Sequence, residues 1–259
     1  MPELPDLTVF SENLTKAFKG KTLTSVRIFH GKRCDASQVF EENVLNKTLS
    51  EVKTIGKEMF FHFGEDVHFG VHLMLKGGTA ISEDLESISY KIAAFGFNDG
   101  KFVVITDPQR WAKVIVNLAK DSTPDALLGS LTLDDFKSAL RRFHGKPVKA
   151  FLIDQAVMKG IGNAYADEIL YDIKVDPASL CNKLPDEIIV SLHKQIPLTL
   201  QWGVDEIRKL TPDAVSGEGR TFMRVHRKDL DKTTTGFIIQ QKDVSGKTSY
   251  FTEEQIYYG

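Results

Sequence analysis

The sequence is poor in cysteine and has no long apolar run, and both absences exclude classes of protein. Only Cys34 and Cys181 are cysteines among 259 residues, which excludes a disulfide framework and a four-cysteine zinc site within one chain. No run of about 18 apolar residues is available for a membrane-spanning helix. The N-terminus also lacks the basic and apolar regions of a signal peptide. We therefore expect an intracellular, soluble protein.

The chain also lacks a basic excess. It has 33 Lys and Arg against 35 Asp and Glu, a net charge of −2, whereas a protein that binds duplex nucleic acid usually carries a clear positive charge. Two segments depart from this balance. Residues 137–149 contain five basic and no acidic residues, and residues 216–249 contain seven basic and four acidic residues. Each alone is typical of a solvated face, but together they favour a surface that contacts phosphate.

The order of hydrophobic patterns predicts an α+β fold in three segments. Helical spacing over residues 4–20 predicts one amphipathic helix. Short β-branched and aromatic runs follow up to residue 118, with a hairpin signal at Asn98–Gly100, and predict a β-sandwich. After a linker at 120–130, residues 131–210 read as four helices and the polar remainder as a two-stranded appendage. We place the domains at 1–128, 129–215 and 216–259.

A glycine-rich turn interrupts the helical segment at QAVMKGIGNAYADE, residues 155–168. We expect one helix to end at Gly160–Gly162 and the next to start at Asn163, with the Asn163 side chain as its cap. The N–H groups of such a turn suit a phosphate. Taken alone, the turn is better explained by a structural helix hairpin than by phosphate binding, and a dinucleotide fold is disfavoured because no strand precedes it.

Four motifs occur in the order and spacing of one family: PELPD at the N-terminus, GKEMFFHF around Lys57, TDPQRW at 106–111, and the turn at 155–168. Over essentially its whole length the sequence resembles the formamidopyrimidine-DNA glycosylase and endonuclease VIII family. The resemblance implies an N-terminal catalytic β-sandwich with an N-terminal helix, a helix-two-turns-helix DNA-binding domain and a C-terminal β-hairpin finger. It implies a protein that binds double-stranded DNA containing damaged bases or abasic sites and uses no metal or cofactor. We expect a monomer, because no partner helix or heptad seam is visible, and a cytoplasmic location if the source is prokaryotic, otherwise a nuclear or organellar one.

The catalytic residues implied by the resemblance are Pro2, Glu3 and Lys57. Removal of Met1 would leave the Pro2 nitrogen as a terminal amine, which titrates near 7.7–8.0 and is far less protonated at neutral pH than a lysine. Pro2 would displace the base at C1′ and hold the sugar as a Schiff base, followed by β- and δ-elimination. Glu3 would move protons at the sugar ring, and Lys57 would contact the phosphate beside the lesion. The alternatives are a helix start at Pro2-Glu3 and a surface lysine.

A second set of residues is implied to contact DNA. It comprises Leu75, His72, Gln109, Arg110, Trp111, Gly162, Asn163 and Lys247. Base flipping leaves a gap in the stack, which Leu75 and Trp111 can fill, whereas Gln109 lacks the guanidinium that many relatives present to the orphaned base. Burial of Leu75 and Trp111 in the sandwich, and an ordinary strand role for His72, are the alternatives.

Several positions depart from the family pattern. The finger, residues 232–255, has none of the four cysteines that commonly bind zinc, so hairpin packing must hold it. Lys247 replaces an arginine and lacks its planar fork, and Asp6 replaces a second glutamate. Ala156 replaces a lysine of 8-oxoguanine-type members, which favours oxidised pyrimidines or a broad damage range. The departures support a second hypothesis, a non-catalytic damage- or structure-specific DNA-binding paralogue.

Overall fold

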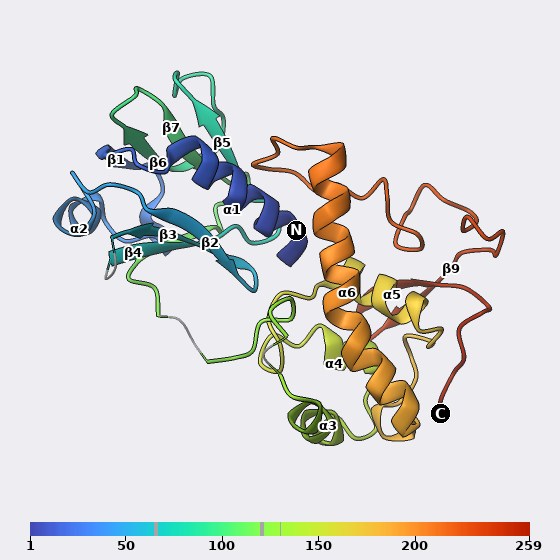
Figure 1. Ribbon diagram of the computed structural model, residues 1–259. Helices are drawn as coiled ribbons and strands as arrows, with labels where there is room; N and C mark the ends of the chain where they lie inside the picture. Colours follow the sequence, from blue (N-terminus) through green and yellow to red (C-terminus); the bar gives the residue numbers. More distant parts are fainter. Residues whose placement is uncertain (65–66, 120–121, 130) are drawn as a thin grey trace. The chain divides into compact units, whose positions relative to one another are not determined.

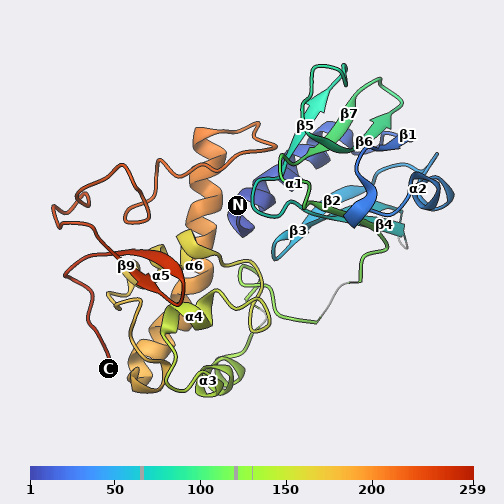
Figure 2. The same cartoon turned by 180° about the vertical axis from the view of Figure 1, so that it is seen from behind.

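The computed structural model describes residues 1–64, 67–119, 122–129 and 131–259 (Figures 1 and 2). The chain folds into two compact units, each described below by itself. Unit 1 contains Met1–Asp121 and Ile207–Glu218, and unit 2 contains Ser122–Glu206 and Gly219–Gly259. Of the predicted linker, residues 120, 121 and 130 lie outside the described residues. The domain boundaries at 128 and 215 stay a prediction.

Unit 1 begins with the predicted amphipathic helix, α1 (Leu4–Phe18). Proline in its first turn suits helix initiation, because the missing N–H would have no helical partner there. Leu7, Phe10, Leu14 and Phe18 recur at helical spacing and are all buried. The helix therefore packs on the sheets through the face that the sequence pattern predicted.

Two four-stranded antiparallel sheets form the predicted sandwich. The first has the order β1-β6-β7-β5, with β1 Leu23–Ile28, β5 Gly78–Ser82, β6 Lys91–Phe97 and β7 Phe102–Thr106. The second has the order β2-β3-β4-β8, with β2 Glu51–Ile55, β3 Glu58–Phe63, β4 Val67–His72 and β8 Lys113–Val116. Strand β5, the 3-10 turn η1 (Gly31–Arg33) and helix α2 (Ser37–Asn43) were not predicted.

Aromatic stacking joins the two sheets in one core. The Phe69 ring of β4 stacks on Phe61 of β3 with centroids 4.6 Å apart, and on Phe95 of β6 in the other sheet at 4.3 Å. All three side chains are almost fully buried. Burial of such large rings gives the sandwich much of its hydrophobic stabilisation.

Unit 2 contains the four predicted helices. They are α3 (Leu133–Arg142), α4 (Val148–Leu152), α5 (Asn163–Asp172) and α6 (Asp186–Leu210), whose last residues belong to unit 1; the short η2 (Cys181–Lys183) precedes α6.

The prediction that the helix before the glycine turn extends to Gly160 is wrong, because α4 ends at Leu152. Beyond it, side chains replace helical hydrogen bonds. The Asp154 carboxylate accepts from Ala156 N–H at 2.9 Å, and the Gln155 side chain accepts from Gly160 N–H at 3.0 Å and donates to the Ile161 carbonyl at 2.8 Å. Local side-chain bonds of this kind compete with helix formation.

The C-terminal segment forms the predicted hairpin of β9 (Gln240–Val244) and β10 (Lys247–Phe251). Ser245 and Gly246 connect the strands with φ of 55° and 75°, the two positive values of the turn type that matches strand twist. In both views the hairpin lies beside α4 and α5 (Figures 1 and 2). No helix of the described residues is long and apolar enough to cross a membrane.

Candidate active site and nucleic-acid interface

Pro2 and Glu3 are buried at the start of α1. Glu3 is the N-cap, and its side chain accepts from the N–H of Asp6 while the Asp6 carboxylate accepts from Glu3 N–H at 2.8 Å. This reciprocal pair is a capping box. The helix-starting role that the sequence offered as an alternative is therefore present, and Asp6 shares it. The Met1 ammonium pairs with the carboxylate of Glu218, from the end of unit 1.

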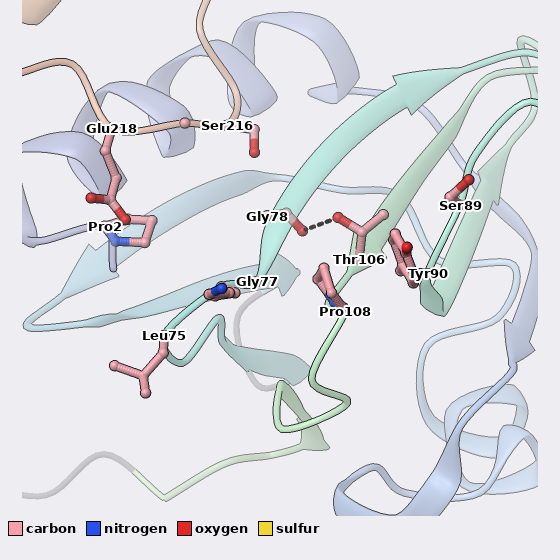
Figure 3. A pocket seen from close by; sticks show the side chains of 12 residues that line it. Pro2, Leu75, Gly77, Gly78, Ser89, Tyr90, Thr106, Pro108, Ser216 and Glu218 are labelled. Carbon is pink, nitrogen blue, oxygen red and sulfur yellow. Dashed lines mark hydrogen bonds between the residues drawn. The ribbon is translucent and has the colours of Figure 1, made fainter.

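A cavity of about 490 Å³ lies within unit 1 beside Pro2 (Figure 3). In Figure 3, Pro2 and Glu218 are at one end of it and Tyr90 and Pro108 are at the other. Its volume is within the range of small-molecule sites, roughly 300–1,000 Å³. Tyr90, which the sequence did not single out, is 63% exposed and has a φ of 57°. The cavity therefore has the predicted nucleophile at one end and an exposed aromatic ring at the other.

A tight loop after β4 presents Leu75 beside this cavity. The N–H of Gly77 donates to the Leu73 carbonyl at 3.0 Å. A Cβ on residue 77 would lie 2.0 Å from that carbonyl oxygen, so the loop requires glycine there. Leu75 is 50% exposed, and the alternative that it is buried in the sandwich is wrong.

Asp107 organises the loop that carries Gln109, Arg110 and Trp111. Its buried carboxylate accepts backbone N–H groups from Gln109 at 2.9 Å, Trp111 at 2.7 Å and Ala112 at 2.9 Å. The three side chains carried by the loop are exposed, Trp111 by 44%, so burial of Trp111 is also wrong. Sequence reasoning missed Asp107, although an Asp-Pro pair after a strand is a signal for such a turn.

Basic residues gather at one end of the β2-β3-β4-β8 sheet. Lys57 lies in the two-residue turn between β2 and β3, and His72 ends β4 opposite Lys113 of β8. Burial, together with the charges of Lys113 and Lys57, lowers the pKa of His72 to about 4. The imidazole is therefore neutral at pH 7. Its Nδ1 accepts from Met74 N–H at 3.0 Å, which places the ring hydrogen on Nε2.

In unit 2 the glycine turn meets the hairpin. Gly162 is the N-cap of α5 and Asn163 its first helical residue, so the prediction that the Asn163 side chain caps the helix is wrong. Glycine tolerates the cap position, and the Asn163 Nδ2 instead donates to the Thr248 carbonyl of β10 at 2.9 Å. Lys247, the residue before Thr248, is exposed at the start of β10.

The two basic segments contribute less surface charge than their composition suggests. Lys149 is fully buried, so its place in a surface patch is wrong. Three basic residues of 216–249 pair with acidic groups: Arg224 with Glu168 and Asp172, Arg227 with Asp229, and Lys242 with Asp176. Fewer positive charges are therefore available to a polyanion than the number of basic residues in these segments suggests.

The two cysteines have the character of structural thiols. Burial raises the pKa of Cys181 to about 12 and also raises the pKa of Cys34, so both thiols stay protonated at neutral pH and neither is an activated nucleophile. Across the ranges that the structure describes, no three His, Cys, Asp or Glu residues are placed to hold a metal ion.

Comparison with known proteins agrees with this architecture. Residues 1–114 match the formamidopyrimidine-DNA glycosylase N-terminal domain, and residues 123–212 match the formamidopyrimidine-DNA glycosylase H2TH domain. The formamidopyrimidine-DNA glycosylase of Desulforamulus reducens is 27% identical over 270 residues, 97% of each chain. That of Bacillus subtilis is 26% identical over 269 residues, again 97% of each.

Solved structures of Lactococcus lactis Fpg share the fold. Its complex with abasic-site DNA has a TM-score of 0.86 at 21% identity, covering 98% of this chain and 99% of that one. Its complex with DNA containing an oxidised pyrimidine has a TM-score of 0.85 at 23% identity, with the same coverage. The fold is thus that of a DNA-repair glycosylase. The chain belongs to the formamidopyrimidine-DNA glycosylase family.

Proposed function

We propose that this protein is a bifunctional DNA glycosylase and AP lyase that excises oxidised bases from double-stranded DNA. The observation that carries the proposal is the position of Pro2, the family's nucleophile by resemblance, in the wall of the cavity of unit 1. Two of the structural relatives were solved with abasic-site DNA and with oxidised-pyrimidine DNA, which supports the same class of substrate here.

In the proposed reaction, Met1 is removed and the Pro2 nitrogen attacks C1′ of the damaged nucleoside. The C1′–base bond breaks, and its electron pair leaves with the base, which takes a proton. Loss of the proton on the Pro2 nitrogen and protonation of O4′ then open the sugar as an iminium ion. The iminium acidifies the C2′ hydrogen, and the 3′ and 5′ phosphates leave in turn by β- and δ-elimination. Glu3 is the proposed proton carrier at the sugar.

The remaining candidate residues are proposed to contact different phosphates of the DNA backbone. Lys57 and His72 lie together at the sheet end and are proposed to bind the phosphate beside the lesion, the neutral His72 by donating from Nε2. Asn163, with the Gly162 turn, and Lys247 are proposed to contact flanking phosphates from unit 2.

Three residues are proposed to act at the vacated stack. Leu75 and Trp111, exposed on their loops, would fill the gap left by the flipped base. Gln109 would face the orphaned base with an amide, which both donates and accepts, so a preference for one opposite base is expected to be weak.

A panel of oligonucleotide duplexes tests this proposal. Excision and strand cleavage would be measured on 8-oxoguanine, formamidopyrimidine, thymine glycol, dihydrouracil and abasic duplexes, after intact mass has shown the loss of Met1. Pro2→Gly and Glu3→Gln should each lose base excision and retain binding. The exposed control Glu42→Gln should keep both. Undiminished excision by Pro2→Gly would overturn the mechanism.

The second candidate is a non-catalytic DNA-binding paralogue. One observation favours it: Glu3 and Asp6 bond to each other's backbone in the capping box, which engages the carboxylate that catalysis would need. This candidate predicts tight binding to abasic duplex with no product from any substrate of the panel, and retention of Met1, which leaves the Pro2 nitrogen as an amide without nucleophilic character.

A further inference from the structure

Lys149 is a buried cation in unit 2 that the proposed chemistry does not use. It belongs to α4 and its side chain is fully inaccessible to solvent. An ammonium group loses its hydration when it is buried, so it is retained only where partners satisfy its charge and its three N–H donors. The partners of Lys149 therefore indicate what the residue holds together.

An ion pair to α5 and two hydrogen bonds to the C-terminal hairpin engage the Lys149 ammonium. Nζ lies 2.6 Å from Oδ1 of Asp167 in α5, 2.7 Å from the Ser249 hydroxyl and 3.2 Å from the Thr248 carbonyl, both in β10. The ammonium thus joins α4 to α5 and to strand β10.

Asp167 extends the network to both sides of the hairpin. Its Oδ2 accepts from Tyr250 N–H of β10 at 3.0 Å and lies 2.7 Å from His226 Nδ1, in the segment that leads to the hairpin. The rings of His226 and Tyr250 pack edge to face at 4.7 Å. One buried carboxylate therefore fixes the finger at two points of the chain.

The same network reaches the two candidate phosphate contacts of unit 2. The Thr248 carbonyl that accepts from Lys149 also accepts from Asn163 Nδ2. The Ser249 hydroxyl, bonded to Lys149, in turn donates to the Lys247 carbonyl at 3.4 Å. Asn163 and Lys247 are thus held by the backbone of three consecutive residues that Lys149 anchors.

We infer that the buried Lys149–Asp167 pair is the positioning device of this finger, fixing Lys247 and Asn163 in the spacing that DNA phosphates require. The finger has no cysteines between residues 232 and 255, and a buried ion pair with a polar network supplies the link between hairpin and helices. Lys149 is a positioning residue, because its buried ammonium acts on DNA only through β10. The inference rests on the proposed DNA-binding function.

A double-mutant cycle on DNA affinity tests the inference. The dissociation constant of a duplex with a tetrahydrofuran abasic analogue would be measured for wild type, Lys149→Met, Lys247→Ala and the double variant, each between 50 and 200 mM salt. We expect each single variant to weaken binding about five- to tenfold at 0.1 M salt, the effect of about one phosphate contact. The double variant should be at most about threefold weaker than either single variant, because both remove the same contact.

The salt dependence separates positioning from mere destabilisation. Lys149→Met should reduce the slope of log affinity against log salt by about one, as Lys247→Ala does, although Lys149 cannot reach a phosphate. The exposed control Lys194→Met removes the same charge from unit 2 and should leave affinity within about twofold. Multiplicative effects in the cycle, or an unchanged slope in Lys149→Met, would overturn the inference.

If Lys149→Met does not fold, a second variant tests the same inference. Ser249→Ala keeps the charge pair and removes one acceptor of the ammonium, so it should weaken binding less than Lys149→Met and show the same non-additivity with Lys247→Ala. Additivity of Ser249→Ala with Lys247→Ala would then count against the inference. A wild-type protein that does not bind the abasic duplex would instead contradict the proposed function.

Discussion

Single polar side chains shape the candidate site by bonding to backbone N–H groups. Asp107 holds the loop of Gln109 and Trp111, and Gln155 closes the turn before Gly160. Because the carboxylate of Asp107 is fully buried, its removal would leave three backbone donors without that partner. The exposed residues of this loop thus depend on a buried neighbour for their backbone conformation.

Replacement of Asp107 by alanine should therefore destabilise unit 1 and weaken DNA binding together. We expect a loss of about 2–3 kcal/mol in the free energy of unfolding, the usual cost of stranding buried donors, measured by urea denaturation. Asp107→Asn should have a smaller effect, since it retains one acceptor oxygen. The exposed control Asp213→Ala should change stability by less than about 0.5 kcal/mol. A similarly small effect for Asp107→Ala would contradict the role assigned to it.

Because the pKa of His72 is low, the stability of the fold should depend on pH. An unfolded histidine titrates near 6.5, whereas burial and the charges of Lys113 and Lys57 lower the folded pKa to about 4. The folded state thus resists protonation, so the contribution of His72 to stability is complete above about pH 6.5 and falls as the pH drops to 4. Stability of wild type relative to His72→Gln should decline across this window. A pH-independent difference would contradict the assignment.

For single residues, the sequence predicted exposure better than it predicted the buried hydrogen bonds and ion pairs that position the exposed residues. Leu75, Gln109, Trp111 and Lys247 are all on the surface, but the bonds of Asp107 and Lys149 are invisible in a one-dimensional pattern. Lys149 lies in a segment whose composition is typical of a surface patch. Only the fold reveals that its charge is paired with Asp167, 18 positions further along the chain. Tertiary pairing of this kind has no local signal.

At the scale of elements, strands and helices followed local patterns where those patterns are strong. The hairpin signal at Asn98–Gly100 connects β6 to β7, and helical spacing correctly placed α1 and α6. The segment after α4 departed from prediction because side chains of Asp154 and Gln155 take the backbone bonds that a helix would make. Strand β5 begins with Gly78 and Thr79, so its sequence has little of the hydrophobic alternation that predicts a strand.

The turn of the finger offers a prediction for an element. Gly246 has a φ of 75°, which costs a residue with a Cβ roughly 1 kcal/mol. Gly246→Ala should therefore increase amide hydrogen exchange in β9 and β10 several-fold while leaving α1 and the sandwich unchanged. Ser245→Gly, at the neighbouring positive φ, is the matched control and should not increase exchange. Equal exchange in the two variants would contradict the turn assignment.

For the whole molecule, the near-neutral charge constrains how DNA is bound. The net charge is −2, and several basic residues of the C-terminal segment are paired within the protein. Affinity must therefore come from a few placed cations rather than from a broad positive field.

Salt titration of DNA binding tests this view. With about four phosphate contacts, affinity for abasic duplex should fall roughly a hundredfold between 50 and 200 mM salt. Fluorescence anisotropy gives the slope directly, and a slope near zero would contradict electrostatic binding of the backbone.

The proposed reaction requires Pro2 to be the nucleophile that forms a covalent bond with the sugar. The most direct measurement is reduction with borohydride during incubation with an abasic duplex, followed by peptide mapping of the adduct by mass spectrometry. We expect a covalent protein–DNA adduct whose sugar remnant is on residue 2 of a chain that has lost Met1. An adduct on a lysine, or no adduct from a protein that binds the duplex, would contradict it.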